Sequence, residues 1–234
     1  MHYWNKEIET MKRQDLENYQ LKHLKNILKH AYYNSLFYRD TFNSAGVSPD
    51  DINSLDDLQK LPLMIKDDIR KDQEAFPPLG QITSVPQKEI VYISVSSGST
   101  GLPTASPFTA QDFEDWIDYE ARQFYSSGMR PKDRYCHALN MSLFVGGPCV
   151  LGAQRIGALS IHAGTLPSER LLKIITQFQP TIIWTTPSYA WYLGETAKKQ
   201  DIDVAQDTSI KKIFVAGEPG GSIKETKKSI EIYD

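Results

Sequence analysis

From residue 89 onward, short apolar segments alternate with longer amphipathic ones, and this alternation constrains the fold more than any other feature of the chain. The apolar segments predict β-strands over residues 90–95, 135–139, 158–162, 181–186 and 212–216. Between them, helices are expected to start at or near Thr109, Gly146, Ser168, Pro187 and Ser222. Strands that alternate with helices form a parallel sheet with helices on its faces. The predicted fold class is therefore α/β, a mostly parallel sheet with flanking helices.

The residues before this alternation have a helical pattern. Over residues 14–45, Leu21, Leu24 and Leu28 recur at the spacing of one helix face, followed by a cluster of aromatic residues expected to be core. We therefore expect a helical N-terminal region, residues 1–88, packed on an α/β subdomain, residues 89–234. Four acidic residues are interpreted as helix caps and solvated surface, not as metal ligands: Asp50, Asp51, Asp56 and Asp57.

Composition excludes several classes of function. The formal net charge is −3 and the isoelectric point is near 6.0, which argues against a nucleic-acid partner. Cys136 and Cys149 match neither a disulfide framework nor a zinc motif, and Cys149 is expected to be a buried structural thiol. His137 and His162 have no ligand partner at metal spacing, so no metal site is expected there. The sequence has no long apolar run and no secretory leader, so we expect a cytoplasmic protein without a membrane partner.

The segment from Ser96 to Thr104 is a loop rich in glycine and hydroxyl groups that follows the first predicted strand. Its glycines allow a tight turn, and backbone N–H groups together with the hydroxyls make a concave anion site. It is not the common P-loop, because Leu102 and Pro103, and no lysine, follow Gly101. The residues expected to bind phosphate are Ser96, Ser97, Gly98, Ser99, Thr100, Gly101 and Thr104. The alternative is a surface turn that binds nothing.

Three further segments fall at predicted carboxyl ends of strands, where open parallel sheets bind ligands. The first is the apolar loop over residues 140–147, which ends in two glycines. The second is residues 185–189, whose hydroxyls are expected to cap the next helix. The third is the turn over residues 217–221, after which Ser222 is expected to cap the last helix. Helix–sheet packing, capping and a plain turn are the structural alternatives for these segments.

The order Ser-Ser-Gly-Ser-Thr-Gly-x-Pro-Thr over residues 96–104 resembles the phosphate loop of the adenylate-forming superfamily, the AMP-binding and acyl-CoA synthetase enzymes. Most branches end this motif in lysine, and Thr104 in that position resembles the phenylacetate–CoA ligase branch. Residues 61–70 resemble the Leu-Pro-x-x-x-Lys-x-Asp-[Leu/Ile]-Arg element of that branch, expected as a short helix that braces the loop. The Leu-Phe-x-Gly-Gly, Thr-Pro-Ser-Tyr and Gly-Glu-Pro segments resemble further elements of the same branch.

This resemblance implies the ATP-dependent activation of an aryl or acyl carboxylic acid, phenylacetate by default. The acid would become an acyl-AMP and then a coenzyme A thioester, with ATP/AMP, Mg²⁺ and coenzyme A taking part. The partners implied are a nucleotide and a small-molecule carboxylate. The resemblance places adenine at Gly217, Glu218 and Pro219. It places the acid in a pocket formed by Asn140, Leu143, Phe144, Gly146, Gly147 and Tyr189.

The sequence departs from the family because its later motifs are absent: the glutamate that binds Mg²⁺, the segment that holds the ribose, and the lid domain with its catalytic lysine. The chain thus resembles an N-terminal portion, and in isolation it is expected to be inactive. Its further partner would be a complementing C-terminal polypeptide or another copy of the chain. The alternatives are a non-catalytic nucleotide-binding remnant or module and a related adenylyl transferase.

Overall fold

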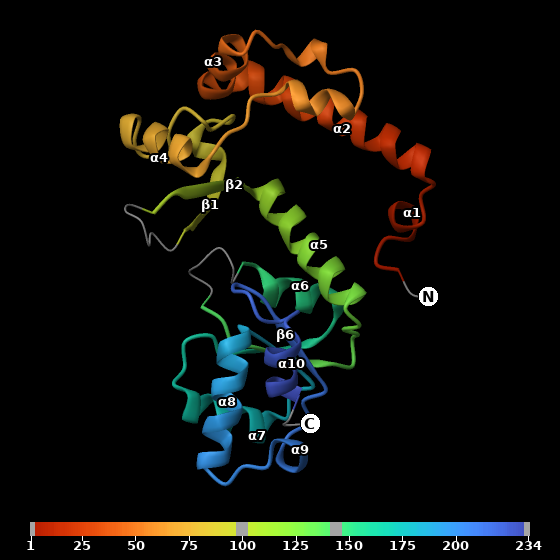
Figure 1. Cartoon of the computed structure of the whole chain (residues 1–234), viewed down its shortest axis with the longest axis vertical. Coiled ribbons are helices and arrows are strands. Elements are labelled where there is room, and N and C mark those ends of the chain that lie inside the picture. Colours follow the sequence, from red (N-terminus) through yellow and green to blue (C-terminus); the bar gives the residue numbers. More distant parts are fainter. Residues whose placement is uncertain (1–2, 97–102, 141–146, 232–234) are drawn as a thin grey trace. The chain divides into compact units, whose positions relative to one another are not determined.

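The computed structural model describes residues 3–96, 103–140 and 147–231, which form two compact units (Figure 1). One, here called the sheet unit, contains the described residues from Glu114 onward together with residues 3 and 4. The other, the N-terminal unit, contains residues 5–113. The domain boundary after residue 88 that the sequence suggests stays a prediction.

The sheet unit is built on four parallel strands in the order β4-β3-β5-β6. Its strands are β3 (Arg134–His137), β4 (Leu159–His162), β5 (Ile182–Thr185) and β6 (Lys212–Val215). Its helices are α5 (Ala110–Ser126, from Glu114 onward), α6 (Cys149–Ile156), α7 (Ser168–Phe178), α8 (Pro187–Lys199), α9 (Val204–Asp207) and α10 (Lys224–Glu231). The predicted class, an α/β fold with a mostly parallel sheet and flanking helices, is confirmed.

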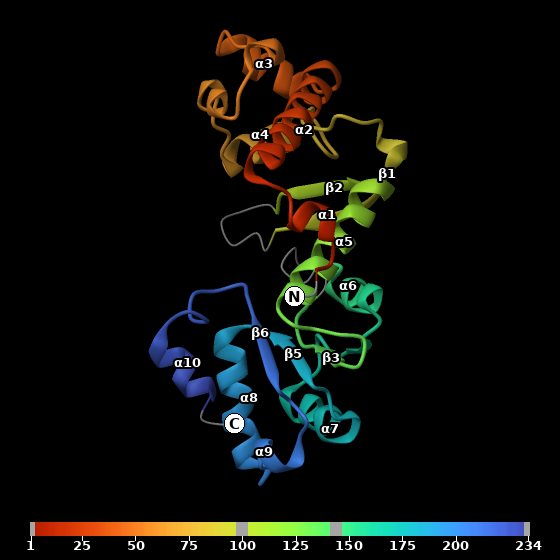
Figure 2. The same ribbon diagram turned by 90° about the vertical axis from the view of Figure 1, so that its right-hand side faces the viewer.

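The central strands are buried on both faces, β5 along its whole length and β3 from Tyr135 onward, which fits the apolar Ile-Ile-Trp sequence of β5. Tyr135, Ile182 and Trp184 pack in one cluster with residues of α5 and α6. The alternate residues Cys136 and Ile183 pack in a second cluster with residues of α7 and α8. Figure 2 shows β5 and β6 side by side, with α8 beside α10.

Several element ends in the sheet unit differ from those expected. Helix α6 begins at Cys149, after Pro148, and not at Gly146. Helix α10 begins at Lys224, so Ser222 does not cap it: the amide of Ile223 donates to the Gly220 carbonyl (2.9 Å), which keeps these residues in a turn. In α7 the predicted apolar stripe is buried at Leu171 and Ile175, but Phe178 in its last turn is 52% exposed.

The N-terminal unit contains helices and one two-stranded sheet. Its core joins Leu28 and Phe42 to Val47 and Ile52, with aromatic residues packed around them as the sequence predicts. The α-helices are α1 (Lys6–Glu9), α2 (Arg13–Asn34), α3 (Leu36–Ser44) and α4 (Lys66–Ala75), and the short 3₁₀ helices are η1 (Pro49–Asp51), η2 (Asp56–Lys60) and η3 (Gln87–Glu89). The two strands are β1 (Ile90–Val95) and β2 (Ala105–Thr109).

The helical region expected over residues 14–45 is divided at Ser35. This residue has an extended backbone and is fully buried. Its hydroxyl donates to the carbonyl of Gln81 (2.8 Å) and accepts from the amide of Tyr38 (3.3 Å), so it caps α3. A serine oxygen that offers the backbone such bonds ends one helix and starts the next.

Strand β1 pairs antiparallel with β2 and does not belong to the parallel sheet, which corrects the expectation for residues 90–95. The sequence did not predict β2 because Pro107 lies inside it. In a two-stranded sheet each strand has an edge without a partner, so a proline opposite Ile93 is tolerated. The predicted capping box at the start of α5 is confirmed, with Thr109 and Asp112 exchanging hydrogen bonds of 2.7–3.2 Å.

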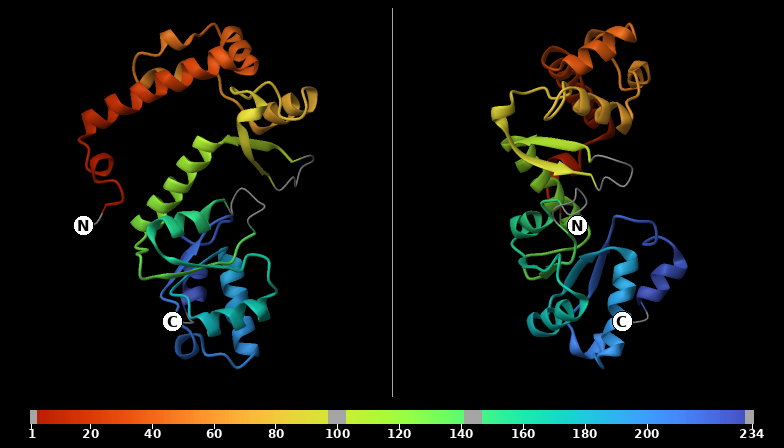
Figure 3. Two further views of the ribbon diagram at one scale, coloured as in Figure 1. Left: turned by 180° about the vertical axis from the view of Figure 1, so that it is seen from behind. Right: turned by 90° about the vertical axis from the view of Figure 1, so that its left-hand side faces the viewer.

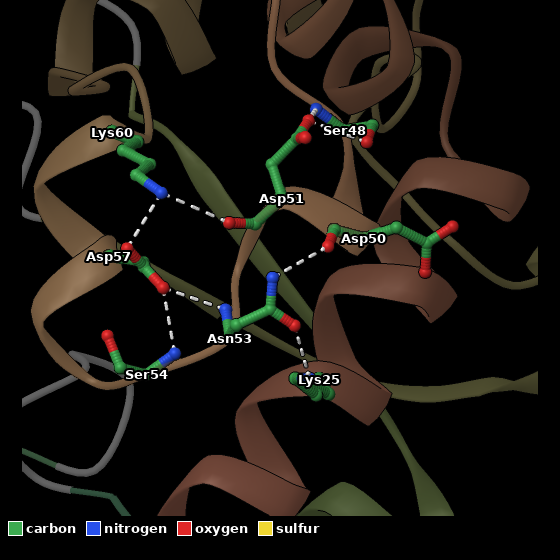
Figure 4. A network of polar contacts seen from close by, with 8 residues as sticks. All are labelled: Lys25, Ser48, Asp50, Asp51, Asn53, Ser54, Asp57 and Lys60. Atoms are coloured by element: carbon green, nitrogen blue, oxygen red, sulfur yellow. Dashed lines mark hydrogen bonds and ion pairs between the residues drawn. The ribbon is translucent and has the colours of Figure 1, made fainter.

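Two aspartates of the acidic run, Asp51 and Asp57, act as caps in a polar network, as predicted (Figure 4). Asp51 accepts a hydrogen bond from the amide of Ser48 (2.7 Å). Asp57 accepts from the amides of Asn53 and Ser54 (2.8 Å each) and pairs with Lys60 (2.7 Å). These bonds favour the charged carboxylates and lower the pKa of Asp57, first through Lys60 and then through the two amides.

Both cysteines are buried free thiols, which confirms the prediction for Cys149. Burial raises the pKa of Cys136 to about 12. Among the helices of the described residues, none has the length and apolar character that crossing a bilayer requires.

Replacing Phe124 by alanine should destabilise the sheet unit by about 3–5 kcal/mol. The ring is fully buried, and its centroid lies 5.3 Å from those of Tyr135 and Trp184. Urea unfolding followed by tryptophan fluorescence checks this, with Phe178→Ala on the half-exposed end of α7 as the control. Equal effects of the two variants would contradict the assignment of Phe124 to the core.

Candidate functional site

Three of the segments singled out in the sequence lie at one edge of the parallel sheet. The strands β3, β5 and β6 run in the same direction, so the residues that follow them share the carboxyl edge. Asn140 follows β3, residues 186–189 follow β5, and Gly217, Glu218 and Pro219 follow β6. The fourth segment, the loop after Ser96, belongs to the N-terminal unit.

The turn at Gly217, Glu218 and Pro219 is tied to the start of α8 by a side chain. A carboxylate oxygen of Glu218 accepts a hydrogen bond of 2.6 Å from the backbone N–H of Ser188. This N–H is in the first turn of α8, where the helix dipole favours a negative charge. The hydrogen bonds with Ser188, and a weaker one with Thr186, lower the pKa of Glu218.

Backbone geometry also explains the glycines of this turn. Gly217 has a φ of +90°, a conformation that other residues rarely adopt. A Cβ on Gly221 would lie only 2.6 Å from the Val215 side chain at the end of β6. The glycines therefore let the turn fold tightly back on the strand that precedes it.

The start of α8 is fixed by residues of the Thr-Pro-Ser-Tyr segment. Thr186 caps the helix by accepting a hydrogen bond from the amide of Tyr189 (3.3 Å), and Pro187 occupies the first helical position, as predicted. The hydroxyl of Tyr189 lies 3.0 Å from that of Ser168, and its ring packs with the cluster of α7 and α8. Tyr189 thus links the starts of two helices.

A hollow of about 390 Å³ lies beside the turn, here called the α8 hollow. Its walls combine aromatic and proline surface with hydroxyls and two carboxylates. The lining residues are Pro187, Ser188, Trp191, Glu218, Pro219, Glu225, Thr226 and Ser229.

At the end of β3, the structure gives Gly147 a packing role. A Cβ on Gly147 would lie 2.7 Å from the Trp116 ring of α5, so the glycine allows this contact. Asn140 is exposed. Leu143, Phe144 and Gly146, which complete the predicted acid pocket, lie outside the described residues.

His137 ends β3 and is fully buried. Its Nδ1 lies 2.8 Å from the hydroxyl of Tyr135, and its ring centroid lies 5.8 Å from that of His162. Burial, and then the charge of His162, lowers the pKa of His137 to about 4. Among residues 3–96, 103–140 and 147–231, no three His, Cys, Asp or Glu side chains gather as a metal site would require.

In the N-terminal unit, the base of the predicted phosphate loop is closed by its two end residues. The amide of Ser96 donates to the carbonyl of Thr104 (3.1 Å), and the amide and hydroxyl of Thr104 both reach the Ser96 hydroxyl (3.0 and 3.1 Å). Thr104, which stands in place of the family's lysine, is buried in these contacts. Ser97, Gly98, Ser99, Thr100 and Gly101 lie outside the described residues.

Figure 3 shows α4 next to the two-stranded sheet. The expected short helix over residues 61–70 begins only at Lys66, and the contact with the end of the loop is made by Gln73, which sequence reasoning missed. The Gln73 amide exchanges two hydrogen bonds with the backbone of Ala105, at 2.8 and 2.9 Å. Because Ala105 directly follows Thr104, these bonds hold the outgoing end of the loop. Gln73 lies on the same helix as the end of the 61–70 segment. This position was the one indication in the sequence that Gln73 could contact the loop.

Residues 16–222 match the family described as AMP-binding enzyme. This range covers most of the chain, so the chain belongs to the AMP-binding enzyme family, and the resemblance seen in the sequence is confirmed.

Within that family, the chain is similar to phenylacetate-coenzyme A ligases. It is 39% identical to that of Escherichia coli (strain K12) over 194 residues, which cover 82% of this chain and 43% of the relative. It is 36% identical to that of Pseudomonas putida over 225 residues, which cover 96% of this chain and 49% of the relative. The chain therefore spans about half the length of these relatives.

The fold is shared with a crystal structure of 2-hydroxyisobutyryl-CoA ligase, which holds 2-HIB-AMP and CoA in the thioesterification state. The TM-score is 0.93 with 32% sequence identity, and the match covers 99% of this chain and 49% of that one.

The amide of Ser188 should report the charge of Glu218. Because the pKa of Glu218 is lowered from 4.5, its contribution is present above that value and is lost as pH falls through the lowered pKa. The Ser188 amide NMR signal should therefore shift in acid for the wild type but stay constant in Glu218→Gln. Glu225→Gln, which changes the other carboxylate of the α8 hollow, should keep the wild-type response. A response unchanged in Glu218→Gln would contradict the bond.

Stability should depend on the protonation of His137. The pKa of an unperturbed histidine is 6.5 and that of His137 in the fold is about 4, so the unfolded chain binds more protons between these values. Unfolding free energy should thus fall by about 3 kcal/mol as pH decreases across this range. Urea unfolding from neutral pH to about pH 4 measures the slope. His137→Gln should reduce it and His162→Gln should retain most of it; equal slopes for His137→Gln and wild type would refute the assignment.

Proposed function

We propose that this chain supplies the nucleotide- and acid-binding part of a carboxylate–CoA ligase that works through an acyl adenylate. The observation that carries the proposal is the turn at Gly217, Glu218 and Pro219, fixed at the carboxyl edge of the sheet by the Glu218–Ser188 bond. Similarity to phenylacetate-coenzyme A ligases over 82–96% of the chain supports it. The related crystal structure with 2-HIB-AMP and CoA supports the two-step chemistry.

In this proposal the adenine lies against the backbone of the 217–219 turn. One oxygen of the Glu218 carboxylate accepts from an amide of α8, so in this proposal the side chain holds the turn while its backbone groups meet the base. A backbone turn with polar groups on its surface can accept from the adenine amino group. The loop over residues 96–104 binds the phosphates, with Ser97, Ser99 and Thr100 as donors and with its two ends closed by Ser96 and Thr104.

The acid pocket is proposed at the end of β3 and the start of α8. Tyr189 and Gly147 act by positioning, because the Tyr189 hydroxyl is close to Ser168 and Gly147 makes room for Trp116. Asn140 is exposed at the same edge and, with Leu143, Phe144 and Gly146, contacts the acid. An aryl acid such as phenylacetate is the first candidate, and a short hydroxy acid like that of the 2-hydroxyisobutyryl-CoA ligase is the second.

Mg²⁺ is part of the proposed chemistry, in which it would neutralise phosphate charge. The described residues contain no cluster of three His, Cys, Asp or Glu side chains, and Mg²⁺ beside a nucleotide is usually held by one or two carboxylates together with phosphate oxygens and water, a set that their arrangement does not single out. No residue of this chain is therefore assigned to Mg²⁺. Further proposals concern the partner, which would be a complementing polypeptide or a second copy of the chain, and a cytoplasmic location. The alternative functions are a nucleotide-binding module and an adenylyl transferase.

ATP binding tests the proposal. Calorimetry should detect ATP binding by the wild type, and Thr100→Ala should weaken it about ten- to a hundred-fold, as expected for a lost hydrogen bond to a charged phosphate. Gly217→Val should weaken it as well, because valine does not tolerate the φ of +90° that shapes the turn. Gln73→Ala should have a smaller effect through the loop end.

Thr176→Val, on α7 and outside both segments, is the matched control for these measurements. Circular dichroism checks that every variant folds. If folded Thr100→Ala and Gly217→Val bind ATP as the wild type does, both binding segments are assigned wrongly. In a separate measurement, phenylacetate or 2-hydroxyisobutyrate is added to the ATP complex of the wild type. The acid that binds more tightly is the better candidate for the substrate.

A further inference from the structure

Glu120 on α5 lies where this helix makes a close contact with α6, within the sheet unit. A Cβ on Gly152 of α6 would be 2.5 Å from the Cβ of Glu120 and 2.9 Å from the backbone nitrogen of Ala121. The glycine therefore lets the two helix backbones approach each other at this point. The Glu120 side chain starts from this contact and is half-buried.

Each carboxylate oxygen of Glu120 accepts one hydrogen bond. The indole N–H of Trp116, one turn earlier on α5, donates to Oε1 (3.1 Å), and the thiol of Cys149, the first residue of α6, donates to Oε2 (3.4 Å). Burial raises the pKa of Glu120, and these two bonds act against that shift. The thiol and the indole are thus the groups that stabilise the charge of this carboxylate.

The same two bonds hold the residues through which the chain enters α6. The Trp116 ring atoms nearest to a Cβ on Gly147 are Cζ2 and Cε2, at 2.7 and 3.1 Å. Because Cε2 is bonded to the nitrogen whose hydrogen Glu120 accepts, this bond sets the orientation of the ring against Gly147. Two residues later, Cys149 is bonded to the other oxygen. One carboxylate therefore holds Gly147 through Trp116, and Cys149 directly.

We propose that Glu120 is a positioning residue for the acid: it holds Gly147 and the start of α6, which border the proposed acid pocket, without touching the acid. This inference rests on the proposed function, which places the acid at the end of β3. Loss of either donor leaves an oxygen of a half-buried carboxylate without its hydrogen bond and lets this part of the chain shift. Acid affinity should therefore depend on Glu120, whereas ATP affinity, assigned to other segments, should not.

Two substitutions of similar size at Cys149 isolate one of the bonds. Cys149→Ala removes the donor, whereas Cys149→Ser keeps one. In the presence of ATP, Cys149→Ala should bind the acid about three- to ten-fold more weakly than the wild type, as the loss of one hydrogen bond implies, and Cys149→Ser should retain most of the affinity. The probe is phenylacetate or 2-hydroxyisobutyrate, whichever the wild type binds more tightly. Calorimetry should give ATP affinities within about two-fold of the wild type for both variants.

Glu120→Ala removes both bonds, and Glu114→Ala is its matched control. Glu114 is also on α5 and pairs with Arg155 in the last turn of α6, so the control removes a contact between the same two helices at the other end of α6. Glu120→Ala should weaken acid binding at least as much as Cys149→Ala does. Glu114→Ala should leave it unchanged, whereas a role of Glu120 in helix packing alone predicts similar effects of the two.

The amide NMR signal of Gly147 gives a readout that needs no ligand. It should shift in Glu120→Ala, a substitution far away in the sequence, and keep its wild-type position in Glu114→Ala. Circular dichroism checks that each variant folds. If Glu120→Ala does not fold, the comparison of Cys149→Ala with Cys149→Ser decides.

The proposal is overturned if folded Glu120→Ala and Cys149→Ala bind the acid as the wild type does, if Cys149→Ser loses as much affinity as Cys149→Ala, or if the Gly147 signal does not move in Glu120→Ala. Equal losses of acid and ATP affinity contradict it too. A wild type that binds ATP but no acid refutes the acid pocket and this proposal with it. A wild type that binds neither refutes the proposed function, and the Gly147 signal then decides whether Glu120 holds this part of the chain.

Discussion

The pairing of β3 with β5 is the interaction on which the sheet unit depends. Both strands are covered on both faces, so their backbone groups must be paired within the sheet. The pairing extends beyond the strands, where the amide of Ala138 donates to the Trp184 carbonyl (2.9 Å) and that of Thr181 to the Arg134 carbonyl (2.8 Å). The parallel direction then brings the polar segments that follow β3, β5 and β6 to one edge.

The two best-defined candidate segments are held in the same way, although they belong to different units. In each, a side chain from a helix or turn bonds to the backbone of a neighbouring segment: Gln73 to Ala105, and Glu218 to Ser188. Such bonds fix a turn while leaving its own backbone groups to meet a ligand. Long polar side chains near a binding loop should therefore be tested as positioning residues before they are assigned direct contacts.

Sequence patterns predicted the α/β class, the parallel sheet, the Thr186 cap and the Thr109–Asp112 capping box, because these follow from local periodicity and side-chain chemistry. They did not predict β2, because Pro107 argues against a strand unless the strand is known to lie at an edge. Nor did they predict Gln73 or Trp116, because each acts on a partner about thirty residues away. The helical pattern places Ser35 inside a helix, because its bond to Gln81 is not visible in local sequence. Local signals thus indicate the elements, and long-range contacts decide their ends and their partners.

The α8 hollow has a property that comes from its aromatic wall. Trp191 is 52% exposed and lines the hollow together with Glu218 and Pro219 of the turn. The wavelength of indole fluorescence depends on the polarity of the surroundings. Any molecule that displaces water from this wall therefore shifts the emission maximum of Trp191. The chain thereby carries an intrinsic optical probe next to the 217–219 turn, one that needs no label and can follow occupancy on the timescale of mixing.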